Sequence, residues 1–176
     1  MTFNTHQAGG LLAAGLVLTT SVPEVTFPLY LLGAIAGSLG AALPDLDHAQ
    51  SVPARSMHLA GYVTSKTLKH RGPLTHSIWT LLILGGFFYF YKETALKNLP
   101  EVVFLCFIAG IYSHHMLDKL TVQGLKWLWP VKITFWPIPK KLRINTNSWM
   151  ERKIIQPSLW LSAAFVWLSP IISWIS

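Results

Sequence analysis

The sequence has little charge and almost no cysteine. Asp, Glu, Lys and Arg make up 12% of its 176 residues, about half the share that is usual in soluble proteins. The single cysteine, Cys106, cannot form an internal disulfide. It lies within an apolar run, where a small buried residue is a more frequent role than a ligand or nucleophile. These scarcities argue against a soluble domain and exclude a disulfide scaffold.

The N-terminal segment also lacks basic residues. Residues 1–7 contain no Lys or Arg, whereas a secretory signal peptide begins with a basic region. We therefore expect the apolar segment that follows to be retained as a helix.

Apolar residues are abundant instead. Hydrophobic residues make up 52% of the chain, with eight Trp and nine Phe, and the mean hydropathy is +0.43. We predict one all-α domain over residues 1–176, a polytopic membrane helical bundle with about five spans. A span needs about 20 apolar residues, so each run has to include polar flanks. The predicted spans are residues 8–20, 27–43, 77–91, 101–119 and 158–175.

Basic residues are distributed unevenly between the predicted loops. Loops 49–76 and 119–156 hold four and eight Lys or Arg, whereas 21–28 and 92–100 hold none and two. The positive-inside rule therefore places the two long loops and the N-terminus in the cytoplasm, and the C-terminus outside. The net charge of +7 then suits an anionic membrane surface better than nucleic acid.

This orientation gathers most of the ionisable motifs at the cytoplasmic ends of the helices. Ionisable groups at membrane depth are costly and point to a functional site. The candidate metal ligands are His6, Asp45, Asp47, His48, His70, His76, His114 and Asp118.

Two of these motifs favour a cation on physical grounds. His114 and Asp118 are four residues apart, so they share one face of a helix, although a hydrogen-bonded pair has the same spacing. Asp45 and Asp47 end an apolar helix, where acidic groups oppose the helix dipole unless a cation offsets their charge. His115 points away from His114 and is expected to be a supporting or packed residue.

Other polar residues have two interpretations each. His70 and His76 could be ligands, or could belong to a polar loop in which Ser77 or Thr75 caps the next helix. Glu151 could be a ligand or base, or could form a capping box with Ser148. Arg143 and Arg71 could hold a phosphate or face lipid headgroups.

Imidazole and carboxylate ligands without thiolate suit zinc, with manganese or iron as alternatives. The candidates exceed the four ligands of one tetrahedral zinc. We therefore predict two or more metal ions, or one ion with a large supporting shell.

The motifs together resemble the bacterial inner-membrane metal-dependent hydrolase family of YdjM type. The resemblance runs in order through most of the chain. One motif, from His70 to Ser77, has one more residue than is usual in that family. The matching motifs are Pro44-Asp45-x-Asp47-His48, His70-Arg71-Gly72-x-x-Thr75-His76-Ser77, Ser113-His114-x-x-x-Asp118-x-x-Thr121-x-x-Gly124, Trp129-Pro130 and Glu151-Arg152.

That family is similar, more remotely, to zinc phospholipase C and P1 nuclease. The resemblance implies a phosphoester hydrolase of the bacterial inner membrane that uses several metal ions, but it names no substrate. We expect the enzyme to depend on zinc and to act at the cytoplasmic leaflet. A lipid phosphoester is the expected substrate, because it would reach such a site by lateral diffusion. The candidate general bases are Asp45 and Glu151, and the candidate phosphate ligands are Arg71 and Arg143. The alternatives are a metal transporter and a non-catalytic module whose metal only holds the helices together. The sequence does not predict the oligomeric state.

Overall fold

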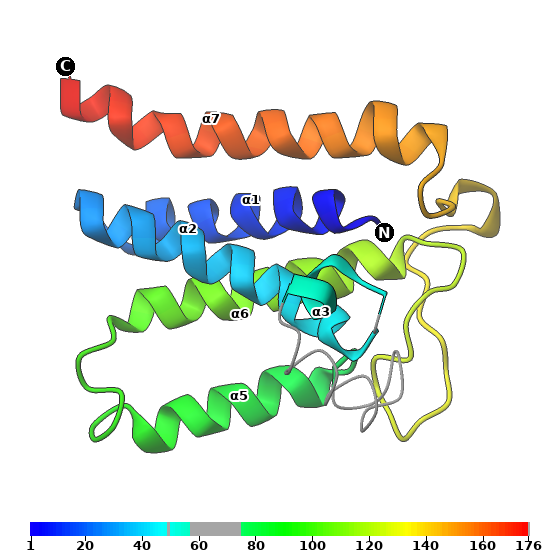
Figure 1. Cartoon of the computed structure of the whole chain (residues 1–176), viewed down its shortest axis with the longest axis horizontal. Coiled ribbons are helices and arrows are strands. Elements are labelled where there is room, and N and C mark those ends of the chain that lie inside the picture. The colour runs from blue at the N-terminus through cyan, green and yellow to red at the C-terminus, as the bar shows by residue number, and fades with distance from the viewer. Residues whose placement is uncertain (49, 57–74, 176) are drawn as a thin grey trace.

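Five long helices form the architecture of the computed structural model, which describes residues 1–48, 50–56 and 75–175 (Figure 1). Helix α1 contacts α2, α6 and α7, α2 also contacts α6, and α5 packs against α6. The short helix α3 (Val52–Ser56) follows the 3-10 turn η1 (Leu43–Asp47). The long helices are α1 (Phe3–Ser21), α2 (Phe27–Ala42), α5 (Ile78–Tyr91), α6 (Glu101–Lys119) and α7 (Gln156–Ile175).

The predicted all-α fold is confirmed, and each predicted span corresponds to one helix. In the described ranges there is no strand, only isolated bridges that pair Thr121 with Ile144 and Leu125 with Phe135. Among the described residues, one helical stretch has the length and apolar content to cross a membrane, the 21 residues of Phe27–Asp47. Helix α5 is apolar but only 14 residues long. Five helices are therefore confirmed, whereas five membrane crossings are not.

Helix α1 begins at Phe3 rather than at the predicted residue 8. The first N–H groups of a helix need outside partners, and the Glu151 side chain accepts the Thr2 N–H at 2.6 Å. Glu151 lies 149 residues away in the sequence, so no local capping signal marks this start. The earlier start places His6 inside the helix.

The last helix also begins earlier than predicted. Helical turns start near Trp149, and a π-helical turn, Glu151–Ile155, leads into α7. Pro157 follows directly, and it lacks the N–H of the usual ladder. A wider turn is one of the ways in which a helix accommodates such an interruption. The predicted span start at residue 158 is therefore too late.

Small residues let α1, α2 and α6 approach closely. A Cβ at Gly40 would meet the Phe107 carbonyl oxygen, and one at Gly110 would meet the Gly37 carbonyl oxygen. Cys106 is fully buried beside Ala14 in the adjoining apolar core, which confirms its predicted role as a small buried residue. Small side chains at such crossings are typical of helices packed in a membrane.

Replacing Gly110 by Ala is expected to destabilise the bundle by about 1–3 kcal/mol, since the added methyl group forces two backbones apart. The control is Gly85→Ala, where a Cβ has no neighbour within 4 Å. That change should be neutral or stabilise by about 1 kcal/mol, because Ala is the better helix former. Thermal unfolding of the detergent-purified protein measures both, and equal stability of the two variants would refute the close approach.

Candidate metal centre

Four separate segments bring buried polar side chains to one end of the bundle. Helix α1 supplies His6, turn η1 supplies Asp45 and Asp47, and α6 supplies His114 and Asp118. His76 comes from the turn before α5, whose N-terminus Ser77 caps by accepting the Trp79 N–H at 3.2 Å. Apart from Asp45, whose side chain is 20% exposed, these side chains are buried.

The orientation of the His114 ring is set by one hydrogen bond. Its Nδ1 lies 2.8 Å from the carbonyl oxygen of Ala41 on α2, so Nδ1 carries the hydrogen and Nε2 presents a lone pair. This Nε2 lies 3.7 Å from Asp45 Oδ1 and 3.8 Å from Asp118 Oδ2, and it has no hydrogen-bond partner among the described residues. A buried lone pair that faces two carboxylates is unfavourable unless a cation lies between them.

Asp118 is the most connected acid of the cluster. Its Oδ1 lies 2.6 Å from the Met1 amino nitrogen and 3.3 Å from His6 Nε2, and its Oδ2 lies 3.9 Å from His76 Nε2. The rings of His6 and His114 stack in parallel with centroids 3.6 Å apart. The Nδ1 of His6 has no hydrogen-bond partner among the described residues. Several imidazole nitrogens therefore surround one buried carboxylate.

Asp47 supports His76 rather than facing the cluster. The Nδ1 of His76 lies 3.3 Å from Asp47 Oδ2 and 3.0 Å from Thr75 Oγ1, and the Thr75 hydroxyl donates to the same Asp47 oxygen. With its hydrogen on Nδ1, His76 directs the Nε2 lone pair toward Asp118. A carboxylate behind a histidine in this way is the usual support for a metal ligand. The predicted ligand role of Asp47 is therefore better assigned to support.

Two overlapping groups have the geometry to hold an ion. In each, one ligand atom per residue lies within 4.8 Å of the others. Two ligands about 2.0–2.1 Å from a tetrahedral zinc are roughly 3.3 Å apart, and neighbouring octahedral ligands are closer. A modest contraction of each group would therefore bring its ligand atoms to metal-binding distances. Both groups share His114, whose one free nitrogen can bind only one ion, so they describe either five donors around one ion or two alternative positions for it. The groups are His6, His114 and Asp118, and Asp45, His76 and His114.

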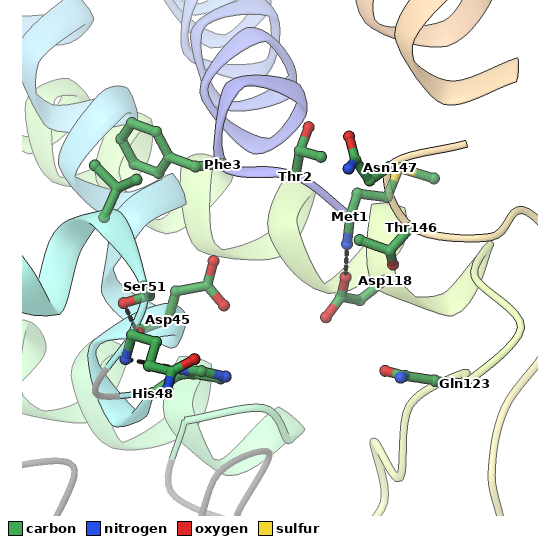
Figure 2. A pocket seen from close by; sticks show the side chains of 12 residues that line it. Met1, Thr2, Phe3, Asp45, His48, Ser51, Asp118, Gln123, Thr146 and Asn147 are labelled. Carbon is green, nitrogen blue, oxygen red and sulfur yellow. Dashed lines mark hydrogen bonds and ion pairs between the residues drawn. The ribbon is translucent and has the colours of Figure 1, made fainter. Parts of the chain in front are cut away.

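A pocket of about 780 Å³ opens beside the cluster (Figure 2). Asp45 and Asp118 line it on the cluster side. The Ser51 hydroxyl donates to the backbone carbonyl of Asp45 rather than to its carboxylate. The remaining lining is largely neutral and polar: Met1, Thr2, Phe3, His48, Gln50, Ser51, Val52, Gln123, Thr146 and Asn147.

The other predicted site residues that the structure describes lie outside the cluster. His48 lines the pocket, and its Nδ1 accepts the Gln50 N–H at 3.1 Å. Arg143 stacks on the Trp136 ring, 4.1 Å from its centroid, and is not among the residues that line the pocket. His70 and Arg71 lie outside the described residues.

Glu151 is buried and fully engaged. Its Oε1 accepts the Thr2 N–H at 2.6 Å and the Thr5 hydroxyl at 2.8 Å, and its Oε2 accepts the Asn147 N–H at 2.6 Å. Ser148 Oγ accepts the Glu151 N–H at 3.3 Å, so half of the predicted capping box forms. Burial raises the pKa of Glu151, but these hydrogen bonds together have the larger, opposite effect. The pKa is therefore below its ordinary value of 4.5. Glu151 therefore joins α1 to the start of α7 and is poorly placed as a base.

Replacing Glu151 by Gln should cost about 1–3 kcal/mol, because one buried N–H donor is left facing the NH2 group of the amide, which cannot accept. A carboxyl with a lowered pKa in the folded state stabilises the fold at neutral pH, and this contribution is lost as the pH falls through that pKa. The wild type should therefore lose more stability than Glu151→Gln between pH 6 and about pH 3. Glu24→Gln, at an exposed position, is the control for denaturant unfolding at both pH values. Parallel curves for wild type and Glu151→Gln would contradict this role.

Several contacts that hold the site together carry no sequence signal. The Ala41 carbonyl orients His114, and Thr75 and Thr5 hold Asp47 and Glu151. His115 is a packed residue, as predicted: its Nε2 donates to the Thr75 carbonyl oxygen at 3.0 Å and its Nδ1 accepts from Trp127 at 3.4 Å. A backbone carbonyl and long-range hydroxyl contacts leave no pattern in the sequence.

Comparison with known proteins places the chain in a family. The model of the family described as YdjM inner membrane protein matches residues 1–176. The uncharacterized protein YvsG of Bacillus subtilis strain 168 is 31% identical over 157 residues, 88% of this chain and 88% of that protein. The inner membrane proteins YdjM of Escherichia coli K12 and Shigella flexneri are 30% identical over 93 residues, 53% of this chain and 46% of theirs. No solved structure matches the chain.

Proposed function

Because the chain belongs to the YdjM inner membrane protein family, we propose that it is a membrane-embedded, metal-dependent hydrolase that cleaves a phosphoester. The family name supports the membrane location and does not mention hydrolysis. The proposal rests on the side chains at one end of the bundle. Zinc is the expected metal, with manganese as the alternative, because the donors are imidazole and carboxylate.

The observation that carries the proposal is the environment of His114. Its Nε2 lone pair faces two carboxylate oxygens at 3.7 and 3.8 Å, with no hydrogen-bond partner among the described residues. A cation is the simplest group that satisfies all three atoms. The ligands would be His6, Asp45, His76, His114 and Asp118.

When bound, such an ion lowers the pKa of a water molecule toward neutrality and withdraws charge from a phosphoryl oxygen. Asp45 is the candidate general base, because its carboxylate is the partly exposed one and faces the pocket. It could equally serve as a ligand. Asp47 would hold the His76 ring, and the Ala41 carbonyl would hold the His114 ring. Glu151 would fix the first turns of α1, on which His6 lies.

The pocket supports a phosphoester as substrate. It opens directly beside Asp45 and Asp118, and its described lining is mainly amides and hydroxyls, which suit a polar headgroup. If the basic end of the bundle faces the cytoplasm, as the positive-inside rule predicts, a phospholipid of that leaflet would reach the pocket by lateral diffusion. We therefore propose a phospholipid-like substrate.

The test is hydrolysis by the purified protein in phospholipid–detergent micelles, with zinc or manganese added. We expect release of phosphate or a phosphoalcohol that requires metal and is lost in Asp45→Asn. Measuring bound metal in the same variant separates a base from a ligand, since loss of the base alone leaves the metal content unchanged. Absence of hydrolysis of phospholipids and of generic phosphoesters by the metal-loaded protein would reject the activity.

One observation favours a second function, a metal that only holds helices together. The five candidate ligands come from four segments of the chain, so an ion would cross-link them. This alternative predicts the same metal content and the same stabilisation without any hydrolysis. A transport pathway is disfavoured, because the described candidates gather at one end of the bundle rather than along it.

A further inference from the structure

A second feature of the same end of the bundle is a basic and apolar loop, residues 126–143. Between residues 119 and 150 the sequence has five Lys and one Arg but no Asp or Glu. Four of these lysines, at 126, 132, 140 and 141, are exposed. Large apolar side chains are exposed among them: Leu128, Trp129, Val131, Ile133, Trp136 and Leu142.

The loop is held in place by hydrogen bonds, so its apolar side chains are exposed in a defined backbone. Leu125 and Phe135 pair through both backbone amides, at 3.4 and 2.8 Å. The Trp79 indole donates to the Trp129 carbonyl oxygen at 2.5 Å, and the Ile78 N–H donates to Trp127 at 2.9 Å. Figure 1 shows the loop, in yellow, at the end of the bundle that carries the N-terminus and α3.

Arg143 adds a specific anion-binding group to the loop. Its guanidinium makes a cation–π contact with the Trp136 ring, with the Cζ atom 4.1 Å from the ring centroid. The side chain is half-buried. A guanidinium held against an aromatic ring is suited to a phosphate group.

We propose that residues 126–143 form a docking surface for anionic phospholipid headgroups. Exposed apolar patches mark interaction sites, and Trp beside Lys is typical of the membrane interface. Charge decides between occupants: a second copy would bring five more cations against the same five, whereas an anionic lipid surface attracts them. Arg143 then contacts a headgroup phosphate outside the hydrolytic pocket. This proposal does not depend on hydrolysis or on bound metal.

The experiment uses the full chain in phosphatidylcholine bilayers that contain phosphatidylglycerol. A thiol-reactive fluorophore is placed on Ile133→Cys, since Ile133 is 60% exposed and Cys106 is buried. Unlabelled lipid is replaced in part by spin-labelled phosphatidylglycerol or, in parallel, by spin-labelled phosphatidylcholine. Asn98→Cys, exposed in the connection between α5 and α6, is the matched control site.

We expect at least twofold stronger quenching by the anionic lipid at position 133, and equal quenching by the two lipids at position 98. The preference should disappear in Lys132→Gln/Lys140→Gln/Lys141→Gln and weaken in Arg143→Gln. The proposal would be overturned if the two lipids quenched the fluorophore at position 133 equally. It would also be overturned if the preference for the anionic lipid survived the triple substitution. Self-quenching that grows with the protein-to-lipid ratio would identify a second copy as the occupant instead, and would overturn it too.

Discussion

His114→Ala is expected to abolish high-affinity metal binding. Both candidate groups contain His114, so its loss removes a ligand whichever arrangement holds the ion. Losing a residue that merely orients a ligand costs about 10–100-fold in affinity, and losing a ligand should cost more. A competition titration with a chromophoric zinc chelator measures the change.

The neighbouring residue supplies a matched control. His115 lies on the same helix, is equally buried, and has both ring nitrogens engaged by Thr75 and Trp127. His115→Gln should therefore leave zinc affinity within a few fold of the wild type. If the two variants lose affinity equally, the loss reflects damage to α6, and His114 is no ligand.

The second large effect is the stabilisation of the fold by zinc. An ion that binds only the folded state adds about 4 kcal/mol when its free concentration is a thousandfold above the dissociation constant. The increase should be large here because the proposed ligands join α1, η1, α6 and the turn before α5. Thermal unfolding with and without zinc measures it, and a chelator should reverse it.

Asp118→Asn should eliminate this zinc-dependent shift. The carboxylate is buried among His6, His76 and His114, and an amide is a much weaker metal ligand. Glu101→Gln, exposed at the opposite end of the same helix, should keep the full shift. A shift that persists in Asp118→Asn would place the zinc elsewhere in the chain.

The sequence was a good guide where the physical cause is local. Apolar runs predicted the five helices, because their composition leaves few other ways to satisfy the backbone in an apolar medium. The four-residue spacing of His114 and Asp118 predicted a shared helix face. Ser77, one of the two residues predicted as a possible cap, does cap α5. The positive-inside rule grouped the ionisable motifs at one end of the bundle. The structure brings five residues of these motifs together at that end.

Long-range contacts were beyond such reasoning. Glu151 accepts the N–H of Thr2, which lies 149 residues earlier at the start of α1, so its buried role is not visible from Ser148 alone. Asp47 was predicted to be a ligand because it ends the same apolar helix as Asp45, where acidic groups oppose the helix dipole. In the structure the two side chains leave the 3-10 turn in different directions, so Asp45 lies near His114 and Asp47 lies near His76. The sequence left open whether Arg143 holds a substrate phosphate or faces lipid headgroups. In the structure Arg143 lies over the Trp136 ring and does not line the pocket.

The most direct test of the central claim is the metal content of the full chain, purified from membranes without chelators and measured by elemental mass spectrometry. We predict at least one zinc or manganese ion per chain in the wild type and in His115→Gln, and none in His114→Ala. A wild-type protein that retains no metal, and takes up none on addition of zinc, would contradict the metal centre and the hydrolytic function built on it.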